Sequence, residues 1–271
     1  MITSTRNPSI RAAQALAKRR DRLARRQFLI QGRRELSRAL AAGVEVVQLF
    51  ADPARLGPDE AELMDAAAAG GADVVEVSGE VLERLGYRAG TEPLVAVAAM
   101  FDTSLARLPL PATTPLLLVM AGVEKPGNIG AMLRTAAAAG VDGVVVADPV
   151  ADVFNPNVVR ASVGALFTVP VAVAGGAEAI DWLRGHGIAV LAATPDGGRP
   201  HWEVPLTGPA AVVVGAEHAG LSPEWLAAAD NHLSIPMAPE IASGADSMNV
   251  GTAAAVLLFE AVRQRAILGR D

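Results

Sequence analysis

The feature that most constrains the fold is a change of pattern between residues 116 and 140. An unbroken apolar run is followed by a polar segment containing Gly127 and Gly130, and then by an alanine-rich segment. This order predicts a buried strand, a tight loop and a helix. A helix that begins directly after a strand aims its free backbone N–H groups at a ligand. We therefore expect a binding loop in which Asn128 caps the helix and Arg134 lies within its first two turns.

Strand-like and helix-like patterns alternate along the rest of the chain, which predicts an α/β protein. A proline-bearing segment without apolar periodicity, 103–115, indicates a linker. We expect a first domain at 1–102 and a second at 116–271. The expected strands are 28–30, 44–51, 74–77, 94–100, 116–121, 143–147, 169–174, 188–193, 210–214 and 233–235, and the expected helices include 8–24, 58–69, 155–165, 177–184 and 247–266.

Composition excludes several classes of protein. Hydrophobic residues make up 51% of the chain, which is a globular profile. Cysteine is absent, so disulfides, cysteine-ligated zinc and cysteine nucleophiles are excluded. The first residues lack the apolar core of a signal peptide, and no apolar run reaches the roughly 18–20 residues of a membrane span. The four histidines show no metal-ligand spacing. We expect a cytoplasmic protein without a metal or a membrane segment.

The charge is distributed unevenly. The net charge is −6, but residues 1–38 contain eleven basic and two acidic residues, a local charge of +9 that leaves −15 for the rest. A basic end on an acidic body is typical of nucleic-acid binding. A solvated helix face in an arginine-rich protein is the alternative, because only two of the basic residues of the chain are lysines.

Two later sequence blocks support a functional interpretation of the glycine-bearing loop. They are Val212–Ser222, and Leu233–Met237 followed by Ser247–Val250. With Glu124–Thr135, and in this order, they resemble the three motifs of the SpoU (TrmH-like) RNA ribose 2′-O-methyltransferases of the SPOUT superfamily. The resemblance spans about residues 116–265. Without it, the first block could equally be an ordinary tight turn with a surface arginine.

The N-terminal part resembles the substrate-binding domain that accompanies many of these enzymes, through Asn7-Pro8, Arg19-Arg20 and the run from Phe28 to Arg33. The resemblance implies a small N-terminal ribosomal-protein-L30e-like α/β domain and a C-terminal SPOUT α/β domain with a trefoil knot. It also implies S-adenosylmethionine as the methyl donor, RNA as the substrate, and a homodimer.

The resemblance carries over to individual residues. The positions that match catalytic residues of the family are Asn128, Arg134, Glu217, Ser247 and Asn249. The positions that match its cofactor contacts are Thr194, Gly215, Ile235, Met237, Met248 and Asn249. The candidate RNA-binding residues are Arg19, Arg20, Arg33 and Arg34, and Arg160 matches a family position that faces RNA or the partner subunit.

Several roles stay open from the sequence. An arginine stays charged at any ordinary pH, so Arg134 suits phosphate binding and orientation of the hydroxyl better than proton abstraction. Glu217 is either a proton acceptor or a structural acid that tethers the loop. Ile235 and Met237 could be plain core residues, whereas Gly215 is expected to let the cofactor come close.

The function expected from these motifs is S-adenosylmethionine-dependent methylation of a ribose 2′-hydroxyl in RNA, with 23S rRNA as the substrate. The same chemistry on tRNA is the alternative. A non-catalytic RNA-binding module is a rival from another class, and a dinucleotide-dependent oxidoreductase is disfavoured because no Gly-x-Gly-x-x-Gly follows a predicted strand. The sequence does not decide which nucleotide is methylated or whether the role is housekeeping or antibiotic resistance.

Overall fold

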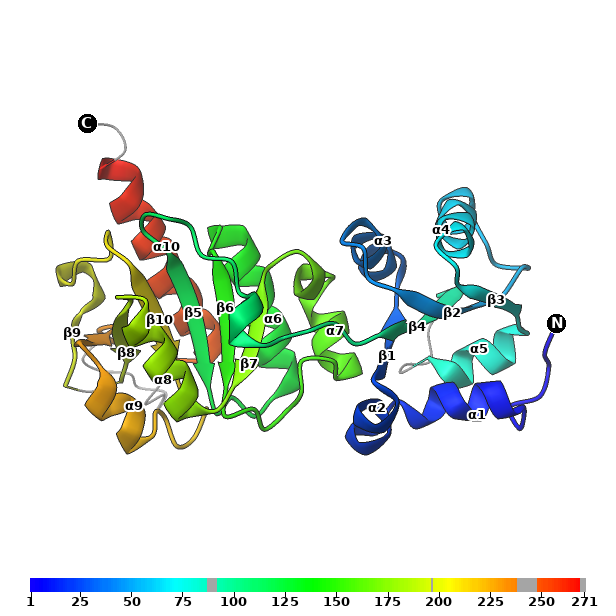
Figure 1. Cartoon of the computed structure of the whole chain (residues 1–271), viewed down its shortest axis with the longest axis horizontal. Helices are drawn as coiled ribbons and strands as arrows, with labels where there is room; N and C mark the ends of the chain where they lie inside the picture. The colour runs from blue at the N-terminus through cyan, green and yellow to red at the C-terminus, as the bar shows by residue number, and fades with distance from the viewer. Residues whose placement is uncertain (87–91, 196, 238–247, 269–271) are drawn as a thin grey trace. The chain divides into compact units, whose positions relative to one another are not determined.

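The structure is a computed structural model that describes residues 1–86, 92–195, 197–237 and 248–268. By their contacts, the residues form two compact units. The first contains Met1–Phe101 together with Asp152–Thr168, and the second contains Asp102–Ala151 and Val169–Asp271. Each unit is an α/β layer structure (Figure 1).

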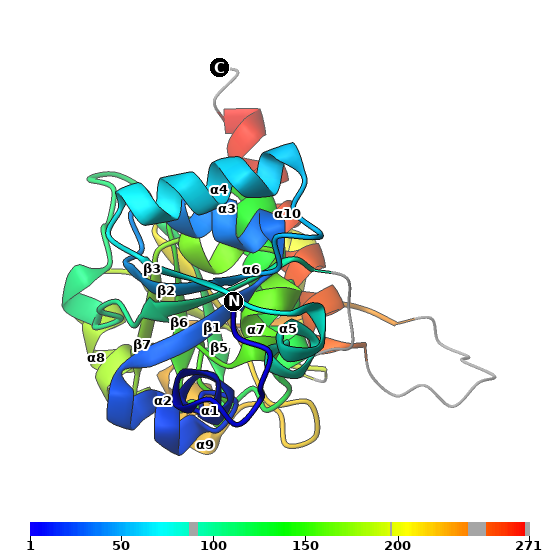
Figure 2. The same ribbon diagram turned by 90° about the vertical axis from the view of Figure 1, so that its right-hand side faces the viewer.

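The first unit is built on a four-stranded sheet with the order β1-β4-β2-β3, in which only β2 and β3 are parallel. Its strands are β1 (Gln27–Gln31), β2 (Val46–Ala51), β3 (Asp73–Glu76) and β4 (Leu94–Ala99), and its helices are α1 (Pro8–Ala15), α2 (Arg19–Arg25), α3 (Arg33–Ala41), α4 (Pro58–Ala69), α5 (Gly79–Leu85) and α7 (Pro156–Ser162), with a 3-10 turn η2 (Ala165–Phe167). Helices α3 and α4 lie on one side of the sheet, and α1 and α5 on the other (Figure 2). The core under α1 and α5 contains Ile10, Leu16, Phe50, Leu82 and Val95.

The expected helix 8–24 is two helices. α1 begins as expected, with Asn7 accepting a hydrogen bond from the Ser9 N–H at 2.9 Å and Pro8 in the first turn. It ends at Ala15, however, and α2 starts afresh at Arg19. Apolar residues alone did not reveal the break, because Leu16, at the corner, is fully buried like a helix-core residue.

Residues 152–168 were expected in the second domain but belong to the first unit. The Arg22 side chain is only 1% exposed and donates to both carboxylate oxygens of Asp152, at 3.3 and 2.5 Å. Phe28 and Phe101 pack against Phe154 with ring centroids 4.9 Å apart. The segment 152–168 therefore completes the core of the first unit.

The second unit is built on a seven-stranded parallel sheet with the order β7-β6-β5-β10-β8-β11-β9. The strands are β5 (Leu116–Ala121), β6 (Gly143–Ala147), β7 (Val171–Ala174), β8 (Ala189–Ala193), β9 (Arg199–Pro200), β10 (Ala210–Val214) and β11 (Asn231–Ser234), and the helices are α6 (Pro126–Ala139), α8 (Gly176–Gly185), α9 (Pro223–Ala228) and α10 (Val250–Leu268), with 3-10 turns η1 (Leu105–Arg107) and η3 (His201–Glu203). β5 and β6 are buried throughout, as strands covered on both faces must be. α6 packs against α10 behind the sheet, and α8 and α9 lie in front of it (Figure 1).

The expected linker is part of the second unit. Leu105 and Leu108 are buried in the core beneath α8. The segment 103–115 is therefore anchored to the core of the second unit by buried leucines, although its prolines leave it without an apolar periodicity that would have predicted this.

Among the described helices, none combines the length and the apolar character that crossing a membrane requires.

Candidate active site

The carboxyl ends of the parallel strands gather the candidate residues at one edge of the second sheet. The loop after β5 leads into α6, the loop after β10 contains Glu217, and Thr194 and Ile235 directly follow β8 and β11. The Thr194 N–H donates to the Leu233 carbonyl at 2.8 Å, which joins two of these loops. Ligands of parallel α/β sheets bind outside this edge.

α6 begins at Pro126, with Lys125 at the capping position and no side-chain cap. The expectation that Asn128 caps this helix is therefore wrong. Pro126 already has the fixed φ of a first helical residue and lacks an N–H that would need a partner, so the helix starts before Asn128. The Asn128 side chain is instead free to reach the second motif. Its Nδ2 donates to Oε1 of Glu217 at 2.6 Å.

Glu217 holds the loop before α6 from its other oxygen. Its Oε2 accepts a hydrogen bond from the Glu124 N–H at 3.4 Å. Burial raises the pKa of the Glu217 carboxyl, but hydrogen bonds from its own N–H, from the Asn128 amide and from the backbone of Glu124 and Lys125 outweigh burial, so the net shift is downward. A carboxylate with a lowered pKa and occupied oxygens is a weak proton acceptor.

Arg134 lies on the exposed side of α6, one face of which contains Gly127, Ala131, Arg134 and Ala138 at helical spacing. No ion pair or hydrogen bond joins its guanidinium to any residue in the described ranges. A Cβ added at Gly127 would meet nothing within 4 Å. The face around Arg134 is thus made of very small side chains, which leaves its five donors open to a ligand.

Gly215 is required by the protein's own backbone, and its expected role in letting the cofactor come close stays a prediction. A Cβ at this position would lie 2.3 Å from the carbonyl carbon of Gly220. Ala216 and Gly220 exchange backbone hydrogen bonds of 3.0 Å, which close a tight turn over 216–220 and bring Gly220 against Gly215. The glycine therefore shapes the loop that presents Glu217.

The other candidate cofactor positions surround the same edge. Ile235 is half-buried and Met237 is 39% exposed, so neither is a plain core residue. Met248 is half-buried. Asn249 caps α10, because its Oδ1 accepts hydrogen bonds from the N–H groups of Gly251 at 2.9 Å and Thr252 at 3.3 Å. The expected catalytic residue Ser247 lies outside the described residues.

The basic residues of the first unit differ in their surroundings. Arg20 is 84% exposed beside Asp21, and Arg19 and Arg34 are exposed. Arg33 forms ion pairs with Asp59 and, at 3.7 Å, with Glu60. The local charge of +9 therefore overstates the surface available to RNA, because Arg22 is buried and Arg33 is partly neutralised.

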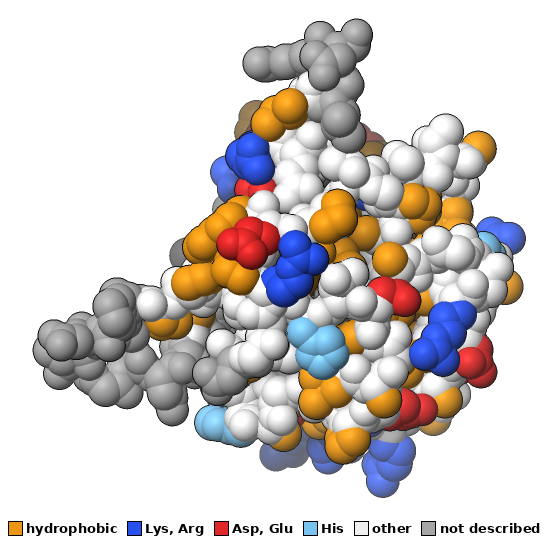
Figure 3. Space-filling view, turned by 90° about the vertical axis from the view of Figure 1, so that its left-hand side faces the viewer, with side chains coloured by type: hydrophobic (Ala, Val, Ile, Leu, Met, Phe, Trp, Pro, Cys, Tyr) orange, Lys and Arg blue, Asp and Glu red, His pale blue; other side chains and the backbone are white. Residues whose placement is uncertain are grey.

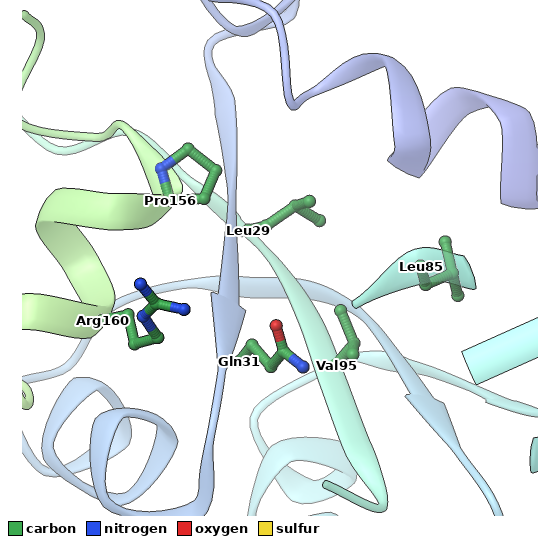
Figure 4. Close-up of a pocket in the computed structure, with 6 residues that line it drawn as sticks. All are labelled: Leu29, Gln31, Leu85, Val95, Pro156 and Arg160. Atoms are coloured by element: carbon green, nitrogen blue, oxygen red, sulfur yellow. The ribbon is translucent and has the colours of Figure 1, made fainter. Parts of the chain in front are cut away.

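Arg160 lines a small pocket of the first unit with Leu29, Gln31, Leu85, Val95 and Pro156 (Figure 4). Its Nη1 is buried and has no hydrogen-bond partner among the described residues, and its Nη2 donates to Asn157 Oδ1 at 3.4 Å. The side chain faces β1 and β4 of the first unit.

No group of three or more His, Asp or Glu side chains is arranged to hold a metal ion in the described part of the chain. The open parallel sheet, the candidate residues gathered at its carboxyl edge and the glycine-bearing loop place the protein in the class of α/β enzymes that bind a ligand at this edge.

Comparison with known proteins narrows this class. The sequence model of the SpoU rRNA methylase family matches residues 115–259, and that of the MRM3-like substrate binding domain matches residues 7–96. A 23S rRNA (uridine(2479)-2′-O)-methyltransferase of Streptomyces viridochromogenes is 35% identical over 99% of this chain and 93% of its own length. The 23S rRNA (guanosine(2553)-2′-O)-methyltransferase RlmP of Bacillus subtilis is 30% identical over 95% of this chain and 97% of its own length.

Among solved structures, that of the SpoU methyltransferase AviRb from Streptomyces viridochromogenes in complex with AdoMet has a TM-score of 0.86 at 34% identity, over 96% of this chain and 99% of that chain. The chain belongs to the SpoU rRNA methylase family.

Proposed function

We propose that this protein transfers a methyl group from S-adenosylmethionine to a ribose 2′-hydroxyl of 23S rRNA. The observation that carries the proposal is the 2.6 Å hydrogen bond between Asn128 and Glu217. It joins the first and second motifs at the carboxyl edge of the sheet, next to the face of α6 from which Arg134 projects, with no partner among the described residues. The two 23S rRNA methyltransferases described above, which are similar over nearly their full lengths, support the choice of substrate.

The residues at the sheet edge fit the cofactor. Half-buried Ile235 and exposed Met237 offer apolar walls for an adenine, and Thr194 stands at the end of the neighbouring strand. The turn that Gly215 permits brings backbone rather than side chains to this edge. Met248 and Asn249 precede α10 and would complete the site. When bound, S-adenosylmethionine supplies an electrophilic methyl group on a sulfonium.

The protein's own part in the reaction is positioning. Arg134 would bind the phosphate next to the target ribose and orient the 2′-hydroxyl. Its guanidinium remains charged, so the proton passes to a phosphate oxygen or to water. Glu217 acts as a tether: it holds Asn128 and the Glu124 backbone so that α6 presents Arg134 in a fixed place. Its lowered pKa and occupied oxygens favour this role over proton abstraction. Ser247 is proposed to act beside Asn249.

The first unit would bind the RNA around the reaction site. Arg19, Arg20 and Arg34 are exposed, and we assign them to the RNA backbone together with Arg33. Because Asp59 and Glu60 already pair with Arg33, its share of the binding should be the smallest.

The surface of α10 supports a homodimer. The first half of this helix, 250–259, is apolar apart from Thr252, and Phe259 and Ile267 are 47% and 52% exposed. Exposed apolar side chains of this size on one helix mark a contact surface. A second copy of the chain packed on α10 would cover these side chains, and sedimentation of the purified protein tests this.

We also propose the finer structural features of the family. The second unit would contain a trefoil knot, and the first would resemble ribosomal protein L30e. An experimental structure that traces the chain from 234 to 250 would decide the first point. The absence of cysteine is compatible with a cytoplasmic location.

The deciding experiment is methyl incorporation from labelled S-adenosylmethionine into protein-free 23S rRNA and into tRNA, with wild type and Arg134→Ala in parallel. We expect label in 23S rRNA at one site resistant to alkaline cleavage, and loss of that label in the variant. Label in tRNA alone would overturn the substrate. Undetectable cofactor binding at millimolar concentration would overturn the activity.

A further inference from the structure

Trp202 is an exposed aromatic residue at the same sheet edge as the candidate site, and none of the three sequence motifs contains it. β9 pairs with β11 so that Leu233 lies opposite Arg199 and Ser234 opposite Pro200. Since the two strands are parallel, η3 leaves β9 beside the point where Ile235 leaves β11.

The exposure of the Trp202 side chain is unusual for a tryptophan. Trp202 is 52% exposed, whereas Trp225 is 1% exposed and Trp182 is half-buried. Figure 3 looks onto this face of the molecule and shows hydrophobic side chains at the surface among acidic and basic ones. Tryptophan combines a large apolar body with a polar N–H, so an exposed indole at a binding edge marks a contact surface.

The turn that carries Trp202 is held in place. The His201 ring contacts the indole edge-to-face at 4.9 Å, and its Nδ1 lies 3.3 Å from the Ser234 carbonyl oxygen. Arg199 Nη2 donates to the Glu203 carbonyl at 2.7 Å. Gln264 on α10 donates to the Val204 carbonyl at 3.1 Å. A ring on such a fixed support loses little freedom when a flat ligand stacks on it.

We propose that Trp202 is a stacking platform for an unpaired base of the substrate RNA that flanks the methylated nucleotide. This rests on the proposed function. Four strand spacings, β5-β10-β8-β11-β9, separate the loop before α6 from η3, which is about 19 Å. A single nucleotide cannot reach from Arg134 to Trp202, so the stacked base belongs to a neighbour of the target. Single-stranded RNA is commonly recognised by stacking of this kind.

The charges around Trp202 define the kind of contact. Arg199 and Glu203 flank Trp202 and are both exposed. Their opposite charges offset each other, so together they give little net attraction for an RNA phosphate. Binding there is therefore stacking rather than counterion release, and its strength should depend little on salt. The basic residues of the first unit should behave in the opposite way.

The test compares full-length wild type with Trp202→Ala, Trp202→Phe and the control Trp182→Phe, using protein-free 23S rRNA. We expect Trp202→Ala to raise KM for rRNA about tenfold, with kcat and S-adenosylmethionine affinity unchanged and the salt slope of RNA binding preserved. Trp202→Phe should retain most of the affinity, and quenching of tryptophan fluorescence by rRNA should persist in Trp182→Phe but disappear in Trp202→Phe.

Other results would overturn the assignment. An unchanged KM with quenching retained in Trp202→Phe would show that the indole does not meet RNA. Weaker cofactor binding in Trp202→Ala would make the ring part of the cofactor site, and loss of self-association would make it part of a subunit interface. If wild type neither binds nor methylates rRNA, the proposed function itself fails, a result distinct from a failure confined to the Trp202 variants.

Discussion

The tether between Glu217 and Asn128 gives a quantitative prediction. In a double-mutant cycle, Asn128→Ala and Glu217→Ala each remove one partner of the 2.6 Å hydrogen bond. If Glu217 acts by holding the loop before α6, both changes break the same connection. The cofactor affinity and kcat/KM of the double variant should then be no lower than those of the poorer single variant.

The magnitude follows from the geometry. A hydrogen bond to a charged group contributes roughly 1.5–3 kcal/mol. Glu217 is only half-buried, so solvent screening places this pair near the lower end. A loss of about 1.5 kcal/mol corresponds to about a tenfold loss. We expect each single variant to have about tenfold lower affinity for S-adenosylmethionine and about tenfold lower kcat/KM.

The assay is calorimetric titration with the cofactor, combined with steady-state methylation of 23S rRNA. His218→Ala is a matched control, since His218 is the exposed neighbour in the same loop. The reasoning is refuted if the two losses add. It is also refuted if Glu217→Gln lowers kcat by roughly a hundredfold or more while Asn128→Ala has little effect, because that pattern belongs to a proton acceptor.

Three further predictions concern stability and RNA binding. Arg265 donates to the carbonyl oxygens of Leu206, Thr114, Pro115 and Gly208, so Arg265→Ala should lower the free energy of unfolding by roughly 2–4 kcal/mol in urea denaturation. Hydrogen bonding to Arg263 lowers the pKa of Glu260 to about 2 from its ordinary 4.5, so its stabilisation is complete above pH 4.5 and is lost as the pH falls toward 2; Glu260→Gln should flatten acid unfolding in that window. Charge reversal at Arg19 and Arg20 should weaken RNA binding and reduce its salt slope more than reversal at Arg33, as titrations at several salt concentrations will show.

Local patterns predicted most elements of the fold. Pro58–Ala69 was expected and is α4, and the apolar runs at 116–121 and 143–147 are β5 and β6. The misses have local causes too. The single expected helix at 8–24 breaks at a buried corner, and β9 was not predicted because a strand of two residues shows no alternation.

The candidate site was predicted in part. Sequence motifs named Asn128 and Glu217 separately, but neither composition nor spacing shows that their side chains meet. The prediction that Asn128 caps α6 was also wrong, because the helix already begins at Pro126. The cofactor role of Gly215 stays a prediction, and the structure adds that the loop itself requires a glycine here, because a Cβ would clash with Gly220.

The sequence by itself determined what is encoded by neighbours along the chain: the alternation of strands and helices, the basic N-terminal end, and the family motifs. Only the tertiary structure decided which distant groups are partners. It assigned Arg22 to Asp152 and 152–168 to the first unit, left Arg134 open on a face of small side chains, and set Trp202 beside the candidate site. The physical reason is that burial and pairing depend on contacts between residues tens to more than a hundred positions apart, and no local pattern records them.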